Sequence, residues 1–443
     1  MFKNEILTPG EKVFKIRKRI CARQEDIAGT QVTRNLISQI ENDKINLTPI
    51  TANFICDNIN KIIEQKDIKG IEVTAEMLLE DIPTQLNRIA DNYITQLRTI
   101  KLEEHKNDFL KEKILEVENF IAKWNIDYIR QAETYAVIGE IYFELEDFYE
   151  SSFKMSLAID LALKAKKYEK AIKYIINASN KLYNSGGSSL EQLRSMRAAL
   201  NLYEDNNLND HNILSNIYFN MAIHYWKLKL FENSIEYLDK VSKFNLDISK
   251  QLDVNLLKAN CLEDNKQFTL AEELYINTLT VALKYSNVTI ISKIYNSLGD
   301  LYRIINNKEN SIKYIIYSIN LKKDIEVNDY ANSLYHALYN LIELDCFNLV
   351  ISNYNETLES ILKSKNKNLY KDIINKLFLY CMENKEYEVI DSLLNKIEMN
   401  IKQKKICNKD IVNIFFQYCY EIKNDEKRKN VFERGINLIK VSV

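Results

Sequence analysis

A short residue pattern recurs along the body of the chain, and it restricts the possible folds more than any other feature. Its clearest copy is Tyr295-x-x-Leu298-Gly299-x-x-Tyr302, and Ser311 follows twelve residues after the glycine. The small-residue position is occupied by Gly139, Ala178, Ala222, Ala259, Gly299, Leu338 and Phe378, with weaker copies around Ala178, Leu338 and Phe378. The successive intervals are 39, 44, 37, 40, 39 and 40 residues. A period of this length indicates an array of stacked structural units.

The residue types of the pattern have a physical explanation. One helix hairpin cannot bury its own apolar faces, so the same unit must recur and stack on its neighbours. A small residue lets the first helix of a hairpin approach the second closely, and an aromatic residue three positions later fills the gap toward the next pair. The pattern resembles the tetratricopeptide repeat, although its period is nearer 40 residues than the usual length of about 34. The body is therefore expected to be a right-handed superhelical array of tetratricopeptide-like helix hairpins.

The distribution of proline and glycine supports an all-α fold. The three prolines are Pro9, Pro49 and Pro83, and the 360 residues that follow Pro83 contain none. Glycine is also scarce, with eight residues in the chain, so few positions would break or weaken a helix. Residues 84–123 are expected to form one further, degenerate helix pair, and residues 409–443 to cap the far end of the array.

The first 70 residues differ from the body because short helical segments alternate with turn signals. Helices are expected at residues 11–20, 24–28, 33–42 and 74–79, and another should begin at Pro49, with Thr48 as its N-cap. Residues 1–70 contain twelve Lys or Arg and nine Asp or Glu, a charge of +3 in a chain whose net charge is −2. A basic head on a mildly acidic body favours DNA contact at one end only.

Two stretches of the head, residues 23–28 and 33–44, resemble the helix-turn-helix of the phage repressors (the XRE type). The resemblance implies that the second motif helix enters the major groove of DNA. It places base-reading residues at Thr33, Arg34, Asn35, Ser38 and Gln39, and phosphate-contacting residues at Gln24, Asn42 and Lys44. Arginine can read guanine, and asparagine or glutamine can read adenine, through paired hydrogen bonds. The resemblance also implies an ion pair between Arg17 and Glu41. The chain departs from the family in one respect: the turn between Ala28 and Thr33 is about one residue shorter, which affects the register of the base contacts.

The second candidate site is the concave face of the repeat array. The first helix of each hairpin would line it through positions 2, 5, 6, 9, 12 and 13 of the repeat. These positions include Asn216, Asn220, Trp226, Lys227, Asp253, Asn260, Lys293, Asn296, Asp300, Arg303, Asn332, Tyr335, His336 and Tyr339. An asparagine amide both donates and accepts hydrogen bonds, so it can pair with the backbone of an extended peptide. Apolar and aromatic positions can hold the side chains of that peptide.

A head and a body of these kinds together resemble the RRNPP-type quorum-sensing receptors of low-GC Gram-positive bacteria, over nearly all of the chain. The resemblance implies a cytoplasmic, homodimeric transcription regulator whose repeats bind a short signalling peptide and thereby change its binding to DNA. A helix-turn-helix dimer would read two half-sites of double-stranded DNA. The expected domains are the helix-turn-helix domain (1–70), linker helices with a degenerate first repeat (71–123), and the repeat domain with its capping helices (124–443).

Other functions receive less support from the sequence. It contains no HExxH, GxSxG, P-loop or GxGxxG motif, so we expect neither an enzyme nor a metal or cofactor site. The seven cysteines form no CxxC pair and are expected to be reduced thiols, and neither a signal peptide nor a membrane span is expected. Two alternatives stay open. The repeats could bind a response regulator or another protein, or the chain could be a constitutive prophage-type repressor that uses its repeats only to dimerise.

Overall fold

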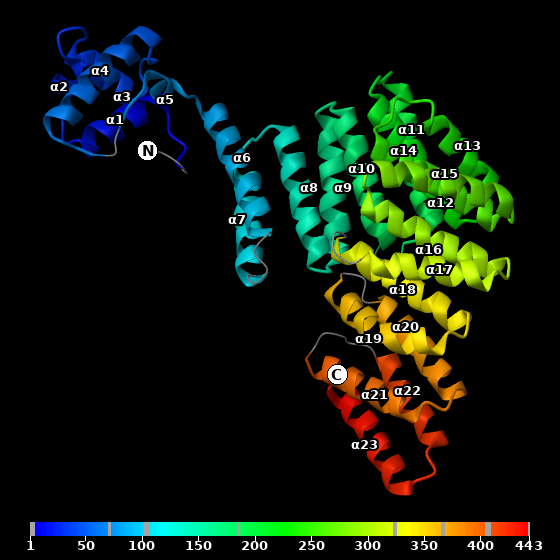
Figure 1. The fold of residues 1–443 in the computed structure, drawn as a ribbon. Coiled ribbons are helices and arrows are strands. Elements are labelled where there is room, and N and C mark those ends of the chain that lie inside the picture. Colours follow the sequence, from blue (N-terminus) through cyan, green and yellow to red (C-terminus); the bar gives the residue numbers. More distant parts are fainter. Residues whose placement is uncertain are drawn as a thin grey trace. The chain divides into compact units, whose positions relative to one another are not determined.

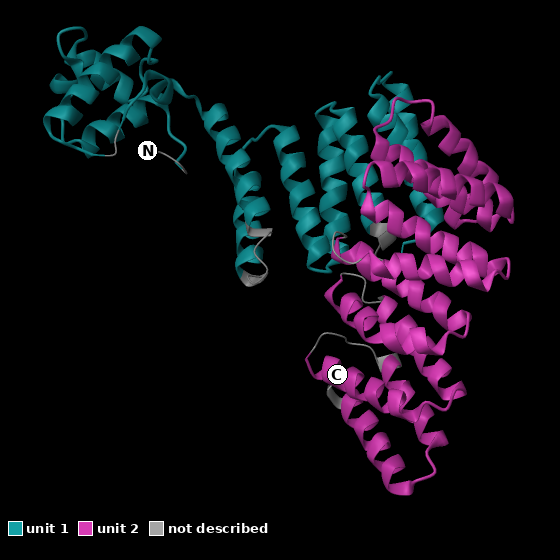
Figure 2. Ribbon diagram, viewed as in Figure 1, with its two compact units in different colours: residues 1–220 teal, residues 221–443 magenta. Residues whose placement is uncertain are grey.

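The computed structural model describes residues 5–69, 72–101, 107–184, 187–321, 326–364, 368–403 and 409–441. Every regular element within these ranges is an α-helix, as the scarcity of proline and glycine predicts. The chain forms two compact units, residues 1–220 and 221–443 (Figures 1 and 2). The domain limits expected at residues 70 and 123 both fall inside the first unit and stay a prediction.

Five short helices form the head, which belongs to the first unit (Figure 1). They are α1 (Pro9–Arg19), α2 (Gln24–Ala28), α3 (Arg34–Glu41), α4 (Pro49–Gln65) and α5 (Ala75–Leu79). The expected helix limits are correct to within two residues because side-chain caps mark the starts. Thr8, Thr33 and Thr48 each accept a hydrogen bond from the backbone N–H three residues later. Apolar side chains of all five helices, among them Ile37 and Ile55, bury a common core.

The remaining helices pair as successive hairpins. In the first unit these are α6 (Ile82–Lys101), α7 (Asn107–Lys123), α8 (Tyr128–Glu144), α9 (Phe148–Lys164), α10 (Tyr168–Asn184) and α11 (Ser189–Asp205), followed by α12 (His211–Lys227), which contains the limit between the units. The second unit continues with α13 (Phe231–Val241), α14 (Ile248–Asp264), α15 (Phe268–Lys284), α16 (Val288–Ile304), α17 (Lys308–Asn320), α18 (Val327–Glu343), α19 (Phe347–Lys363), α20 (Asn368–Glu383), α21 (Tyr387–Lys402), α22 (Lys409–Glu421) and α23 (Asp425–Val441). We call the first helix of each hairpin, from α6 to α22, helix A, and the second helix B.

The two helices of a hairpin approach closely at the small residue of the repeat. Ser311 Oγ on α17 donates a hydrogen bond of 2.6 Å to the carbonyl oxygen of Gly299 on α16. Equivalent bonds of 2.7 and 2.8 Å occur in the copies centred on residues 139 and 222. A Cβ atom on Gly299 would lie 2.8 Å from Ile315 Cγ1. The role that the sequence analysis assigned to this position, close approach of the two helices, is therefore confirmed in these copies.

The turn between helices A and B has the same backbone geometry in six hairpins. The seventh residue after the small position has a positive φ, between 51° and 62°, at Glu146, Lys229, Lys266, Asn306, Asp345 and Lys385. The next N–H then bonds back across the helix end, as from Asn307 N to Tyr302 O at 2.8 Å, and satisfies a terminal carbonyl. Glycine usually occupies this left-handed position. Because none of these six positions is a glycine, the glycines of the sequence do not predict the turns.

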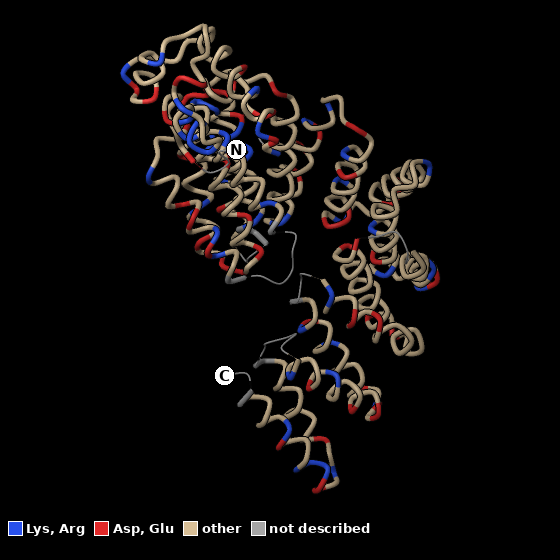
Figure 3. The backbone as a smooth tube through the Cα atoms, turned by 90° about the vertical axis from the view of Figure 1, so that its left-hand side faces the viewer, with Lys and Arg blue, Asp and Glu red and all other residues tan. Residues whose placement is uncertain are grey.

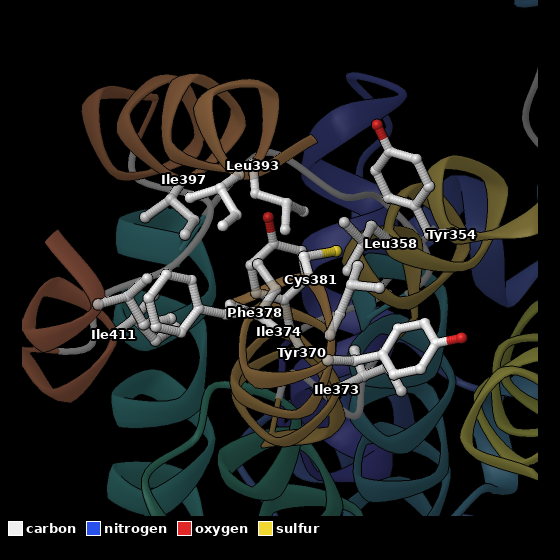
Figure 4. Close-up of a cluster of buried hydrophobic side chains, with 14 of the residues drawn as sticks. Tyr354, Leu358, Tyr370, Ile373, Ile374, Phe378, Cys381, Leu393, Ile397 and Ile411 are labelled. Carbon is white, nitrogen blue, oxygen red and sulfur yellow. The ribbon is translucent and has the colours of Figure 1, made fainter. Parts of the chain in front are cut away.

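The C-terminal hairpins share one large apolar core (Figure 4). Side chains of α19, α20, α21 and α22 meet in it, with Leu393 and Ile397 above Phe378 in the view. Phe378 occupies the position where other copies have a small residue, and its large side chain is buried there, with 2% of it exposed. The hairpin of α20 and α21 therefore accommodates a ring where the hairpin of α16 and α17 has no room for a methyl group.

Three further findings concern the described residues only. None of their helices combines the length and the apolar character needed to cross a membrane. Their cysteines have no disulfide partners. No three of their His, Cys, Asp or Glu residues are grouped so that they could hold a metal ion.

Candidate functional site

The outward side of α3 is the first candidate site. Thr33, Arg34 and Asn35 are exposed at the start of the helix, and Ser38 and Gln39 are partly exposed one turn later. The apolar residues of α3 lie on the other side, in the core of the head. The five residues for which the sequence predicts base contacts are therefore accessible together on one short helix.

A buried ion pair fixes α3 to α1. Arg17 Nε and Nη2 donate hydrogen bonds of 2.5 and 2.7 Å to the two carboxylate oxygens of Glu41. Both side chains are less than one-tenth exposed, and the bond to Glu41 raises the pKa of Arg17. The ion pair implied by the resemblance is therefore present. Gln24, a predicted phosphate contact, donates from Nε2 to Glu41 Oε2 at 2.8 Å, so its amide is already bonded within the head.

The other predicted contacts of the head are accessible to solvent. Asn42 is exposed and donates from Nδ2 to the backbone oxygen of Ser38 at 2.7 Å. Lys44 is exposed beyond the end of α3. Arg34 Nη1 lies 3.3 Å from Glu25 Oε1, and both side chains are at least 60% exposed. An exposed pair of this kind is weak, so Arg34 can exchange Glu25 for another partner.

The second candidate site lies on the A helices of the second unit. We call its predicted residues the inner wall: Trp226, Lys227, Asp253, Asn260, Lys293, Asn296, Asp300, Arg303, Asn332, Tyr335, His336 and Tyr339. They come from α14, α16, α18 and the end of α12. The two remaining predicted residues, Asn216 and Asn220, belong to the first unit.

Many inner-wall residues join one A helix to the next. Trp226 Nε1 donates to Asp264 Oδ2 at 2.5 Å, and Arg303 Nε donates to Asn340 Oδ1 at 3.1 Å. Contacts between residues 36 or 37 positions apart in the sequence join Asn260 to Ser297, Lys293 to Asp329, Asn296 to Ser333 and Tyr335 to Asp372. The sequence analysis did not single out these partners. Adding 37 residues, slightly less than one repeat interval, to the predicted positions would have found most of them.

Two of the asparagines expected to contact a ligand are buried. Asn220 is 9% exposed, and its Nδ2 donates to the backbone oxygen of Asn216 one turn earlier at 2.8 Å. Asn296 is 8% exposed and donates from Nδ2 to Ser333 Oγ at 2.9 Å, whereas its Oδ1 has no hydrogen-bond partner among the described residues. Asn332 on α18 is half-buried, and Asn216 is exposed. The asparagines therefore differ in what they can offer a ligand.

Electrostatic interactions connect inner-wall residues of different A helices. His336 is exposed on α18, yet burial lowers its pKa, while Asp300 of α16 acts in the opposite direction and Lys227 of α12 lowers it further. On α14, burial raises the pKa of Asp253, and Lys293 of α16 opposes this shift. Ionisable side chains on different A helices of the second unit therefore lie close enough to shift one another's pKa.

A polar network lies beside the inner wall and joins α14 to α15. The Tyr275 hydroxyl lies 2.7 Å from Asn260 Oδ1 and 2.6 Å from Glu263 Oε2. Burial raises the pKa of Glu263 to about 8, so this carboxyl is mostly protonated at neutral pH. The wall near Asp300 and Arg303 therefore carries less negative charge than the sequence alone suggests.

The inner wall combines charges of both signs with aromatic rings. Lys and Arg are interspersed with Asp and Glu along the helices of both units (Figure 3). The rings of Tyr335 and His336 meet edge to face at 5.2 Å, and Lys376 Nζ lies 3.7 Å from the centre of the Tyr339 ring. Such a surface suits a ligand that has charged ends, hydrogen-bonding groups along its length and apolar side chains.

Comparisons with known proteins agree with the repeat architecture. The model of the tetratricopeptide repeat family matches residues 215–247 and 292–324, which contain the copies centred on Ala222 and Gly299. The chain therefore contains tetratricopeptide repeats in its body. No curated protein sequence matches it significantly.

Among solved structures, the chain is similar to aspartyl phosphate phosphatase F from Bacillus subtilis, with 14% identity and a TM-score of 0.48 over 88% of this chain and 93% of that one. It is similar to the apo form of RapI, with 13% identity and a TM-score of 0.47 over 61% of this chain and 97% of that one. It is also similar to NprR in complex with its cognate peptide NprX, with 14% identity and a TM-score of 0.44 over 79% of this chain and 99% of that one.

Proposed function

We propose that this chain is a cytoplasmic, homodimeric transcription regulator of the RRNPP type, whose repeats bind a short linear peptide and thereby change DNA binding by the head. The observation that carries the proposal is the inner wall. Exposed and half-buried polar and aromatic side chains from successive A helices lie together there and contact or influence one another. The second support is the set of accessible amide, hydroxyl and guanidinium groups on α3.

The inner wall has the hydrogen-bonding groups that an extended peptide needs. Such a peptide has no strand neighbour, so its backbone N–H and C=O groups must find partners on the receptor. Asn296 Oδ1 is a buried acceptor that has no hydrogen-bond partner within the described part of the chain, and Asn332 on the next A helix is half-buried. Lys227 and Lys293 supply positive charge, and Asp300 supplies negative charge. The two charged ends of a short peptide can therefore both be compensated.

The proposed coupling follows from the construction of the array. Each hairpin contacts mainly its neighbours, so small rotations between hairpins accumulate along the chain. A peptide that contacts several A helices favours one set of rotations over another. Only such a difference in affinity can shift the equilibrium between two forms. In a dimer, the shift would change the spacing of the two heads and hence their fit to two half-sites.

The peptide site is tested by the substitution Asn332→Ala. Peptides captured by the full chain from a pool of short synthetic sequences are identified by mass spectrometry, and the tightest is labelled for anisotropy titration. We expect Asn332→Ala to weaken its binding roughly five- to tenfold, because one hydrogen bond to the peptide is lost. Asn353→Ala is the matched control, since Asn353 is equally half-buried but lies on the neighbouring B helix.

Equal losses in Asn332→Ala and Asn353→Ala would place the peptide elsewhere. If the chain retains no peptide from the pool but binds a folded response regulator, the protein-interaction alternative is correct. A dimer whose contacts occlude the inner wall would support the constitutive repressor.

The DNA site is tested by the substitution Arg34→Ala. DNA sequences selected by the wild-type chain from a random pool serve as the specific probe, and unselected DNA of equal length is the reference. We expect the preference for the selected sequence to fall by about 1–3 kcal/mol, because a paired contact to a base edge is removed. Lys61→Ala removes the same charge from an exposed site on α4 and should leave the preference unchanged. A uniform loss on both DNA samples in Arg34→Ala would assign Arg34 to phosphate contact instead.

A further inference from the structure

A cavity of about 290 Å³ lies between α9 and α11, over α10, in the first unit. It is separate from the inner wall, whose residues all belong to the second unit. Phe143, Phe148 and Met155 supply part of its apolar lining, and five serines, Gln192 and Lys181 supply polar groups. Its volume is at the small end of the range for ligand pockets, about 300–1,000 Å³.

The repeat pattern explains why the cavity is present. Three residues after the small position, the clear copies carry an aromatic residue between two successive B helices. Tyr302 on α16 shows the arrangement: its ring stacks on Tyr314 of α17 at 5.5 Å, and its hydroxyl bonds to Glu272 of α15. In the hairpin of α10 and α11 this position is Lys181. The space that a tyrosine fills in the clear copies is therefore left open between α9 and α11.

One polar group of the cavity lacks a partner. Gln192 is fully buried, and its Oε1 accepts a hydrogen bond of 2.6 Å from Ser179 Oγ. Its Nε2 is also buried but has no hydrogen-bond partner among the described residues. A buried donor left unbonded costs about 1–3 kcal/mol. A ligand oxygen in the cavity would supply the missing acceptor.

The charge of the lining favours an anion. Lys181 Nζ lies 4.4 Å from the centre of the Phe143 ring, so the ammonium group is held at the cavity. None of the described residues that line the cavity is acidic. Apolar and aromatic side chains make up most of the remaining lining. The cavity therefore offers one cation, one unsatisfied amide donor and an apolar chamber.

We infer that this cavity binds a small organic monocarboxylate with an aromatic or branched apolar body. The carboxylate accepts hydrogen bonds from Gln192 Nε2 and pairs with the Lys181 ammonium, while the apolar body packs against Phe148 and Met155. A charge-assisted bond to a carboxylate is stronger than a bond between neutral groups. The cavity therefore discriminates against a neutral compound of the same shape.

The test measures binding of hydrocinnamate to the full chain by saturation-transfer NMR and calorimetry. Hydrocinnamyl alcohol, which has the same body without the charge, is the neutral analogue. We expect saturable binding of hydrocinnamate and weaker binding of the alcohol. Lys181→Gln keeps the cavity open but removes the charge, so hydrocinnamate should bind roughly tenfold more weakly while the alcohol is unaffected. Lys173→Gln is the control, because Lys173 is exposed on the same helix but does not line the cavity.

A second variant fills the cavity. Lys181→Tyr introduces the tyrosine that the clear copies of the repeat have at this position, so it should abolish binding of both compounds and raise the thermal midpoint of unfolding. The inference is overturned if hydrocinnamate does not bind saturably, which would mean that the cavity holds water only. It is also overturned if Lys181→Gln weakens both compounds equally, or if Lys181→Tyr still binds hydrocinnamate.

Discussion

Phe378→Ala is expected to destabilise the C-terminal hairpins by about 3–5 kcal/mol. The side chain is 2% exposed and lies in the core formed by α19–α22 (Figure 4), so its removal leaves a cavity that the helices can only partly close. The repeat pattern alone predicts that alanine would be tolerated here, because most clear copies have a small residue at this position. Hydrogen exchange of the α20 and α21 amides in the full chain measures the effect, since hairpins in such arrays can open locally.

The neighbouring residue provides the control. Leu379 is 56% exposed on the same helix, so Leu379→Ala removes a similar apolar group and should change local stability by no more than about 0.5 kcal/mol. If Phe378→Ala were as mild as Leu379→Ala, the hairpin of α20 and α21 would be able to close around a small residue. The difference between Phe378 and Gly299 at the same repeat position would then have no structural basis.

The local structure of this chain is well predicted from its sequence where short-range signals determine it. The caps at Thr8, Thr33 and Thr48 define the starts of head helices, because a side-chain oxygen bonds to a backbone N–H three residues away. The period of the small residue predicts the hairpins. Its physical explanation, close helix approach, is confirmed at Gly299 by the short distance to Ile315.

The inner wall is less predictable, because its contacts join residues one repeat apart. Asn220 and Asn296 occupy positions that a helical wheel assigns to the ligand side, yet packing against neighbouring helices buries both. Periodicity within one helix contains no information about the next helix. The raised pKa of Glu263 has the same origin, since burial by several helices causes it. The turns at Asn306 and its equivalents were missed because no glycine marks them.

Arg17→Met is expected to destabilise the head by about 3–5 kcal/mol, comparable with the total stability of many small domains. It leaves the Glu41 carboxylate buried, and among the described residues Gln24 Nε2 is then its one remaining side-chain donor. The desolvation cost of that charge is then no longer offset by an opposite charge. Hydrogen exchange should accelerate in α1 and α3 of the full chain, while the hairpins of the second unit keep their protection.

Two further variants separate the ion pair from general disturbance of the head. Arg17→Met combined with Glu41→Leu removes both charges and should recover stability to within about 1 kcal/mol of wild type, because well-packed apolar residues can replace a buried ion pair. Arg34→Ala breaks the exposed pair with Glu25 and should change head stability by less than about 1 kcal/mol. If the double variant were as unstable as Arg17→Met, the head would depend on the hydrogen bonds of Glu41 to α1 and α2 rather than on charge compensation.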